Sequence, residues 1–252
     1  MIEVLTLSII QGITEFIPVS SSSHLILFSE FFNFNAGNLS LDVNLHLGSL
    51  LAVLVFFKRD IADFTKNKDL FKKIIISSVP VIFLGFFLVQ YNLIDQIRNI
   101  KVIAWTTLLF GILLYVSDRF QLNKKLEKDF TYKNAIVIGL FQMLSLVPGV
   151  SRSGIVITAA RMLNYDRYDS SRISFLLSIP TLGVVSIYGI KKIIYSGDIY
   201  FSTLNLLSIL LSFVFSFLTI KYFLIFVKKF NLISFVLYRC VLGVLLLYFV
   251  YS

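Results

Sequence analysis

Long apolar stretches alternate with short polar breaks along the whole chain. Their lengths and their lack of strict polar–apolar alternation predict helices rather than strands. Segments of this kind are typical of a chain that crosses a lipid bilayer, where helices satisfy their own backbone groups. The ten predicted segments are residues 2–19, 20–34, 45–57, 74–91, 102–117, 135–147, 151–163, 173–190, 204–222 and 232–250.

The first half of the chain resembles the second half when it is shifted by 131 positions. Gln11 then falls on Gln142 and Ser20 on Ser151, and the apolar segments coincide as well. We therefore predict one membrane domain, residues 1–252, made of two repeats over about 1–120 and 132–252. In each repeat we expect a re-entrant hairpin followed by three spanning helices. Three crossings are an odd number, so the two repeats must be inverted.

The loop charges predict the orientation of these segments. On one side the predicted loops carry 16 Lys and Arg residues, and on the other side they carry 4. The positive-inside rule places the charge-rich side in the cytoplasm and both termini outside.

Composition supports an all-α integral membrane protein. The chain of 252 residues is 57% hydrophobic and only 15% charged. Its net charge of +9 comes from short loops rather than a continuous patch, so we expect no nucleic-acid partner. The single cysteine, Cys240, lies in an apolar segment and cannot form a disulfide within the chain. The first residues show no signal peptide, so the first segment is expected to remain.

Polar residues gather at the expected turn of the first hairpin. Gln11 and Glu15 share one helix face, and Pro18 disfavours continuation of that helix. The serines at 20–23 can cap the next helix, whose first turn holds His24 and whose N-terminus suits an anion. The serines and His24 fit packing as well as function. A glutamate in a membrane segment is costly to bury, which favours a functional role.

The second hairpin carries a similar motif in residues 148–154, Pro-Gly-Val-Ser-Arg-Ser-Gly. Ser151 and Ser153 can cap the helix that follows, and Arg152 offers a planar charged fork suited to phosphate. If the hairpins are inverted, Glu15 and Arg152 meet near the midplane and form a phosphate site.

Two other polar residues are interpreted as structural. His46, on the segment 45–57, is expected to support the fold, near the rim of the site at most. Arg239 is expected to pair with a structural partner, because it lies far from both motifs in the sequence.

The motifs resemble those of the bacterial undecaprenyl-diphosphatase family, the bacitracin-resistance phosphatases. The resemblance covers essentially the whole chain. It rests on Gln11-x-x-x-Glu15, on residues 18–24 and 148–154, and on 42–48, 175–180 and 238–239. Three positions depart from the usual pattern. Gln11 leaves one motif carboxylate, Ser23 stands where Gly is usual, and Val156 stands where Thr is usual.

The resemblance implies a fold of inverted repeats in the bacterial cytoplasmic (inner) membrane, with a site that faces the outer side. It implies hydrolysis of undecaprenyl diphosphate to undecaprenyl phosphate and inorganic phosphate, which recycles the carrier lipid for cell-wall synthesis and gives bacitracin resistance. It also implies a divalent cation, Mg²⁺ or Ca²⁺, and roles for Glu15, Ser20, Ser21, His24 and the turn 151–153.

The hypothesis that follows combines these residues in one site. Ser21 is the candidate nucleophile, His24 the candidate acid or base, and Glu15 the candidate metal ligand, with an activated water as the competing route. Alternative functions are a polyprenyl-phosphate flippase and a structural membrane subunit, and a homodimer is one assembly considered. Catalytic roles are predicted for Glu15, Ser21, His24 and Arg152, and substrate contacts for Gln11, Ser20, Ser22, Ser151, Ser153 and Gly154.

Overall fold

The computed structural model describes residues 2–32, 39–63, 68–120, 124–196 and 203–252. Helices account for nearly all of these residues, and none of them lies in an extended strand. The elements are α1 (Ile2–Thr14), α2 (Ser21–Phe32), α3 (Leu39–Phe56), α4 (Lys58–Asp63), α5 (Lys68–Gln90), α6 (Ile94–Ile97), α7 (Ile100–Asp118), α8 (Leu126–Asp129), α9 (Tyr132–Met143), the 3₁₀ turn η1 (Leu144–Leu146), α10 (Arg152–Met162), α11 (Arg167–Ser196), α12 (Thr203–Lys229) and α13 (Ile233–Tyr251).

Five helices are long and apolar enough to cross a membrane by length and composition, namely α5, α7, α11, α12 and α13. Helix α3, which we also expected to span, is apolar but shorter over its fully described part. All ten predicted apolar segments contain a helix. The all-α membrane architecture is therefore confirmed, and the chain is a multi-pass membrane protein.

The predicted loops also contain short helices that the hydropathy pattern did not indicate. Helices α4, α6 and α8 lie between longer apolar elements. The first helix is shorter than predicted, because α1 ends at Thr14 and a turn occupies the residues before Ser20. Pro18 lies within this turn, which agrees with its expected effect on helix continuation.

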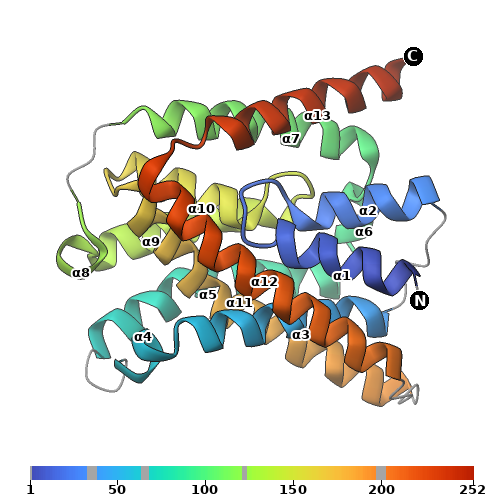
Figure 1. Ribbon diagram of the computed structural model, residues 1–252, viewed down its shortest axis with the longest axis horizontal. Helices are drawn as coiled ribbons and strands as arrows, with labels where there is room; N and C mark the ends of the chain where they lie inside the picture. Colours follow the sequence, from blue (N-terminus) through green and yellow to red (C-terminus); the bar gives the residue numbers. More distant parts are fainter. Residues whose placement is uncertain (1, 33–38, 64–67, 121–123, 197–202) are drawn as a thin grey trace.

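Two half-length hairpins, α1–α2 and α9–α10, meet at their turns (Figure 1). Ser153 Oγ, from the second hairpin, donates to the carbonyl of Ile17 in the first turn at 2.8 Å. Ser20 and Ser151, which the 131-residue shift pairs, both have left-handed backbones, with φ of 78° and 73°. Such angles are uncommon for residues other than glycine. The start of α1 and the end of α13 lie at the same edge of the molecule (Figure 1). The inverted relation between the repeats stays a prediction.

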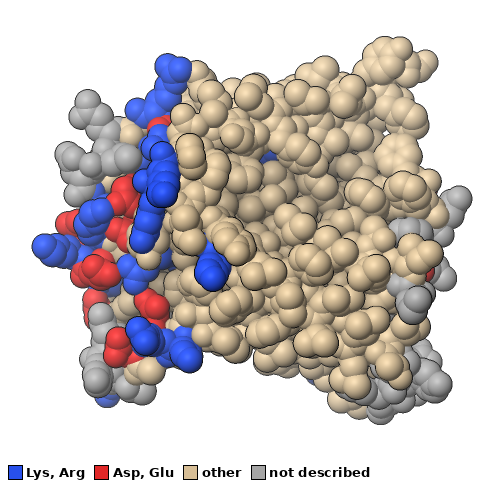
Figure 2. All heavy atoms as spheres, in the orientation of Figure 1, with Lys and Arg blue, Asp and Glu red and all other residues tan. Residues whose placement is uncertain are grey.

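Charged side chains gather at one edge of the molecule, where α4 and α8 lie, and the face beside them is mostly uncharged (Figures 1 and 2). Ion pairs connect the elements there. Arg172 on α11 binds Asp60 at 2.7 Å and Glu127 at 2.8 Å, and the carboxylate of Asp118 on α7 forms ion pairs with Arg161 and Arg167. This edge contains loops predicted to face the cytoplasm.

Candidate active site

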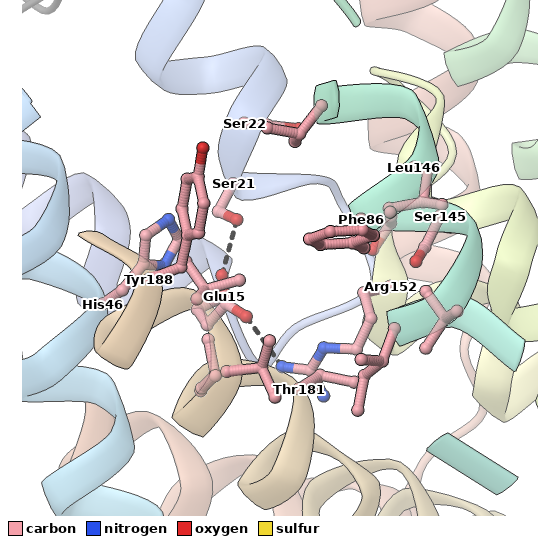
Figure 3. Close-up of a pocket in the computed structure, with 18 of the residues that line it drawn as sticks. Glu15, Ser21, Ser22, His46, Phe86, Ser145, Leu146, Arg152, Thr181 and Tyr188 are labelled. Atoms are coloured by element: carbon pink, nitrogen blue, oxygen red, sulfur yellow. Dashed lines mark hydrogen bonds and ion pairs between the residues drawn. The ribbon is translucent and has the colours of Figure 1, made fainter. Parts of the chain in front are cut away.

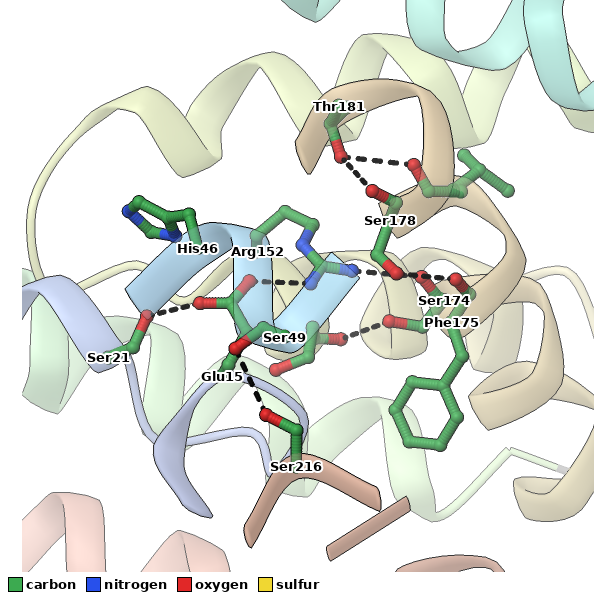
Figure 4. Close-up of polar contacts among 12 residues, drawn as sticks. Glu15, Ser21, His46, Ser49, Arg152, Ser174, Phe175, Ser178, Thr181 and Ser216 are labelled. Carbon is green, nitrogen blue, oxygen red and sulfur yellow. Dashed lines mark hydrogen bonds and ion pairs between the residues drawn. The ribbon is translucent and has the colours of Figure 1, made fainter. Parts of the chain in front are cut away.

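Glu15 and Arg152 form an ion pair inside the protein. Arg152 Nη2 lies 2.7 Å from Glu15 Oε1, and the side chains are only 13% and 7% exposed, respectively (Figure 4). Glu15 lies in the turn after α1, and Arg152 is the first residue of α10. The two hairpin turns thus bring together the two charges that the sequence motifs predicted to meet. Each charge compensates the cost of burying the other.

The second oxygen of Glu15 accepts two further hydrogen bonds. Ser21 Oγ donates to Glu15 Oε2 at 2.7 Å, and Gln11 Nε2 donates to the same oxygen at 3.1 Å. Arg152 in turn donates from Nη1 to the carbonyl of Ser174 on α11 at 3.0 Å. The carboxylate is therefore placed to take a proton from the Ser21 hydroxyl, and a serine paired with a base is an activated nucleophile.

A cavity of about 400 Å³ opens beside this ion pair (Figure 3). One wall is polar and the other is apolar. The polar wall consists of Glu15, Ser20, Ser21, Ser22, His46, Ser145, Ser151 and Arg152. The apolar wall comes mainly from the second halves of α5 and α11, with Val81, Ile82, Gly85, Phe86, Val89, Leu182, Val184 and Val185. Leu146 adds to it, and Thr181 and Tyr188 on α11 also line the cavity.

The two walls match the two parts of an amphiphilic ligand. Cavities of this size hold small molecules, with a few polar groups that set the orientation of the ligand. The guanidinium and the hydroxyls suit an anionic head group, whereas the side chains of α5 and α11 suit a hydrocarbon chain. The arrangement is therefore suited to chemistry on the anionic end of a lipid.

Comparison with known proteins identifies the family. Residues 4–245 match the family model described as Bacitracin resistance protein BacA. The chain belongs to this family. A relative named Undecaprenyl-diphosphatase from Pelagibacter ubique (strain HTCC1062) is 45% identical over 253 residues, covering 100% of this chain and 98% of the relative.

Two further relatives carry the same name. The protein of Teredinibacter turnerae is 40% identical and covers 98% of each chain. The protein of Saccharophagus degradans is 38% identical and covers 94% of this chain and 93% of the relative. The family resemblance expected from the motifs is confirmed along nearly the whole chain.

Four predicted site residues of this BacA-family chain do not line the cavity: Gln11, His24, Ser153 and Gly154. Gln11 is fully buried and donates a hydrogen bond to the carboxylate of Glu15. Ser153 ties the two turns together, and the backbone nitrogen of Gly154 donates to Ser151 Oγ at 3.1 Å. The other six predicted residues, Glu15, Ser20, Ser21, Ser22, Ser151 and Arg152, line it together.

His24 faces α13 rather than the cavity. Its Nδ1 lies 2.7 Å from the carbonyl of Ser20, which can only accept, so Nδ1 carries the proton. In the neutral ring, Nε2 then accepts from the hydroxyl of Tyr238 at 2.5 Å. Both ring nitrogens are therefore occupied, and the predicted role of His24 as acid or base stays a prediction.

His46 has a more direct position than its sequence suggested. It lines the cavity, and its Nδ1 lies 3.1 Å from Gln11 Nε2. The sequence interpretation placed it at the rim at most, because a histidine in a helical segment is more often a packing residue. Its spacing from the motif residues gave no sign of contact, since α3 approaches α1 only in the folded chain.

Arg239 on α13 holds both hairpin turns, although it is remote from them in sequence. The fully buried guanidinium donates to four backbone carbonyls, at distances of 2.9–3.2 Å. Three of these carbonyls belong to the turns, at Pro18, Gly149 and Val150. The structural role expected for Arg239 is confirmed. Its partners, however, are the turns of the two motifs, which lie far from it in the sequence.

The described residues contain no group of three or more His, Cys, Asp or Glu side chains that could hold a metal ion. Glu15 is the one carboxylate on the described cavity wall. A carboxylate has about four lone-pair sites, and Arg152, Ser21 and Gln11 use three of them. The residues therefore fit a cation that arrives with an anionic substrate, rather than an ion held by protein ligands alone.

Proposed function

We propose that this chain hydrolyses undecaprenyl diphosphate to undecaprenyl phosphate and inorganic phosphate, and so recycles the carrier lipid for cell-wall synthesis. The observation that carries the proposal is one cavity with a serine–carboxylate–arginine group at one wall and apolar helix faces at the other. Membership of the BacA family and full-length relatives named Undecaprenyl-diphosphatase support it. The same activity underlies bacitracin resistance.

The head group and the tail of the substrate occupy different walls. Arg152 and the hydroxyls of Ser20, Ser22 and Ser151 hold the diphosphate. The prenyl chain lies along the apolar side chains of α5 and α11 and continues into the bilayer. Gln11, Ser153 and Gly154 are buried and position these residues through hydrogen bonds to Glu15, Ile17 and Ser151.

Ser21 is the proposed nucleophile. Its Oγ forms a bond with the terminal phosphorus while the bridging P–O bond breaks, and that electron pair leaves on the oxygen of undecaprenyl phosphate. The hydroxyl proton passes to Glu15 Oε2, 2.7 Å away. A water molecule then hydrolyses the phosphoserine, which restores Ser21 and releases inorganic phosphate. In the competing route Glu15 activates a water that attacks phosphorus directly.

A divalent cation, Mg²⁺ or Ca²⁺, would be held by Glu15 and the diphosphate oxygens, and would neutralise part of the charge on the substrate. Because the cation would need the substrate as a ligand, we expect it to restore activity without raising the melting temperature of the substrate-free protein.

His24 contributes by position. It holds the carbonyl of Ser20 in the left-handed turn that presents Ser21. Acting as an acid or base would require His24 to release Tyr238 or Ser20 first.

The site is proposed to face the outer side of the bacterial cytoplasmic membrane. Helices α5 and α11 both begin at the charge-rich edge, and their cavity residues lie in their second halves. The cavity therefore lies away from the edge that the positive-inside rule assigns to the cytoplasm.

Purified protein supplied with undecaprenyl diphosphate tests the proposal. We expect release of inorganic phosphate, loss of release in excess chelator, and recovery when Mg²⁺ or Ca²⁺ is added back. Absence of phosphate release under all these conditions would exclude the hydrolase. Redistribution of lipid between the leaflets of reconstituted vesicles without phosphate release would instead indicate a flippase.

A further inference from the structure

Of the two histidines in the chain, His46 alone lines the cavity. It lies on α3, close to the Gln11–Glu15–Ser21 chain of hydrogen bonds. The proposed mechanism assigns His46 no part, although His46 lines the cavity together with Glu15 and Ser21 (Figure 3).

The hydrogen bonds of Gln11 define the protonation of this ring. The group of Gln11 that faces Glu15 must be a donor, because that carboxylate already accepts from Arg152 and Ser21. The amide nitrogen is therefore the atom that also lies 3.1 Å from His46 Nδ1. An amide nitrogen donates and does not accept, so Nδ1 must be the acceptor. In this tautomer the proton of His46 is on Nε2.

Nε2 of His46 has no hydrogen-bond partner within the described part of the chain. The amide oxygen of Gln11 is a buried polar atom without a partner, but Nε2 of His46 is not such an atom. Nε2 is therefore not enclosed by the protein. Since His46 lines the cavity and Nδ1 contacts Gln11, Nε2 is the ring nitrogen left available to a ligand in the cavity. It is a donor in the place where an anion would need one.

The backbone that carries His46 is held firmly against α12. Ser212 Oγ donates to the carbonyl of Leu45 at 2.6 Å, and Ser49 Oγ bonds to Ser212 and Ser216. A Cβ at Gly48 would lie 2.4 Å from the carbonyl of Ile209, so α3 and α12 are in close backbone contact there. This packing sets the position of His46 before any substrate binds, as precise recognition requires.

We infer that His46 is a substrate-binding residue that donates its Nε2–H to an oxygen of the lipid diphosphate. Arg152 already bonds to Glu15 and to the carbonyl of Ser174, so it cannot satisfy every oxygen of this anion. Gln11 contributes by keeping Nδ1 as the acceptor. The inference rests on the proposed hydrolysis and adds a specific contact to it.

Two substitutions at the same position separate this role from a structural one. In His46→Asn the amide oxygen can replace Nδ1 and keep the contact with Gln11, but the donor to the cavity is lost. In His46→Gln the amide nitrogen can replace Nε2 and keep that donor. We expect kcat/KM for undecaprenyl diphosphate to fall about 10- to 100-fold in His46→Asn, with most of the change in KM. We expect a fall of less than about fivefold in His46→Gln.

Leu51→Ala is the matched control, because Leu51 also lies on α3 but is exposed and does not line the cavity. It tests a general disturbance of α3, and its KM should stay near that of the wild type. Wild-type behaviour of His46→Asn, equal losses in both His46 variants, or a larger loss in His46→Gln would each overturn the inference. If the wild-type protein itself releases no phosphate, the proposed function fails instead.

Discussion

At the scale of single residues, two opposite charges define the site. Glu15 and Arg152 are 137 positions apart in the sequence, and their side chains are only 7% and 13% exposed, respectively. This pair could be predicted from the sequence, because an ionised group in a membrane segment needs a partner and each hairpin motif offered one charge. The relative positions of His24 and His46 could not be predicted. They depend on the rotation of α2 toward Tyr238 and on the packing of α3 beside α1.

Substitution of Arg152 should reduce catalysis without preventing insertion. Arg152→Lys keeps one positive charge but loses the planar fork that contacts both Glu15 and the carbonyl of Ser174. We expect kcat/KM to fall about 100-fold in Arg152→Lys and about 1000-fold or more in Arg152→Ala. Phosphate-release kinetics on protein that elutes as a single species in detergent measures this, and near wild-type turnover of Arg152→Ala would refute the site.

Ser21→Ala should abolish turnover more completely than Ser22→Ala does. Both side chains line the cavity, but only Ser21 donates to Glu15. We expect a loss of about 1000-fold or more for Ser21→Ala and a much smaller loss for Ser22→Ala. Rapid-quench detection of phosphoserine in the wild type adds a direct test. Its absence, together with an active Ser21→Ala, would favour the activated water.

At the scale of elements, hydropathy predicted where helices occur better than it predicted where they end. Each apolar segment contains a helix, but α1 stops at Thr14 and the short helices α4, α6 and α8 were not expected. Apolar composition continues through the turn after α1, so only Pro18 marked the break. Close contacts between helices could not be predicted from hydropathy either, because they depend on which residues face each other across the bundle.

Gly48 should tolerate no side chain, whereas Gly183 should. A Cβ at Gly48 would lie 2.4 Å from the carbonyl of Ile209, but a Cβ at Gly183 would meet no atom within 4 Å. We expect Gly48→Ala to lower the free energy of unfolding by about 1–3 kcal/mol, because α3 and α12 must separate. Gly183→Ala should leave it unchanged or raise it by about 0.5–1 kcal/mol. Thermal unfolding in detergent measures both, and equal melting temperatures would contradict this account of the packing.

Arg239→Ala should loosen both hairpin turns together. It leaves the carbonyls of Pro18, Gly149 and Val150 without their donor, at a cost of about 1–3 kcal/mol for each unpaired buried group, which the removal of a buried charge offsets in part. We expect a clear fall in melting temperature and a loss of phosphate release. Arg119→Ala, at an exposed arginine, should change neither. A stable and active Arg239→Ala would show that the turns hold without it.

At the scale of the whole molecule, the charged side chains are concentrated toward one end. Lys, Arg, Asp and Glu gather at the edge that contains α4 and α8 (Figure 2). The loop charges predicted such an edge from the sequence alone. They could not predict the ion pairs within it, such as Arg172 with Asp60 and Glu127, which join elements far apart in the chain.

Labelling of single cysteines in intact cells tests the orientation. In a Cys240→Ser background, Lys191→Cys lies near the end of α11 and Lys128→Cys lies in α8 at the charged edge. Both positions are exposed. We expect a membrane-impermeant maleimide to label Lys191→Cys in intact cells, and Lys128→Cys only after the cells are opened. The reverse pattern would place the cavity on the cytoplasmic side.

The hydrogen bonds from Arg239 to both turns also affect when the site can form during protein synthesis. Arg239 follows every other residue of the site in chain order, so ribosomes deliver the hairpins to the membrane before the guanidinium that joins them. A nascent chain that lacks α13 therefore has the nucleophile and the charges but no assembled pocket. Hydrolytic competence would arise late in synthesis, and a separately expressed α13 should restore it to a truncated chain.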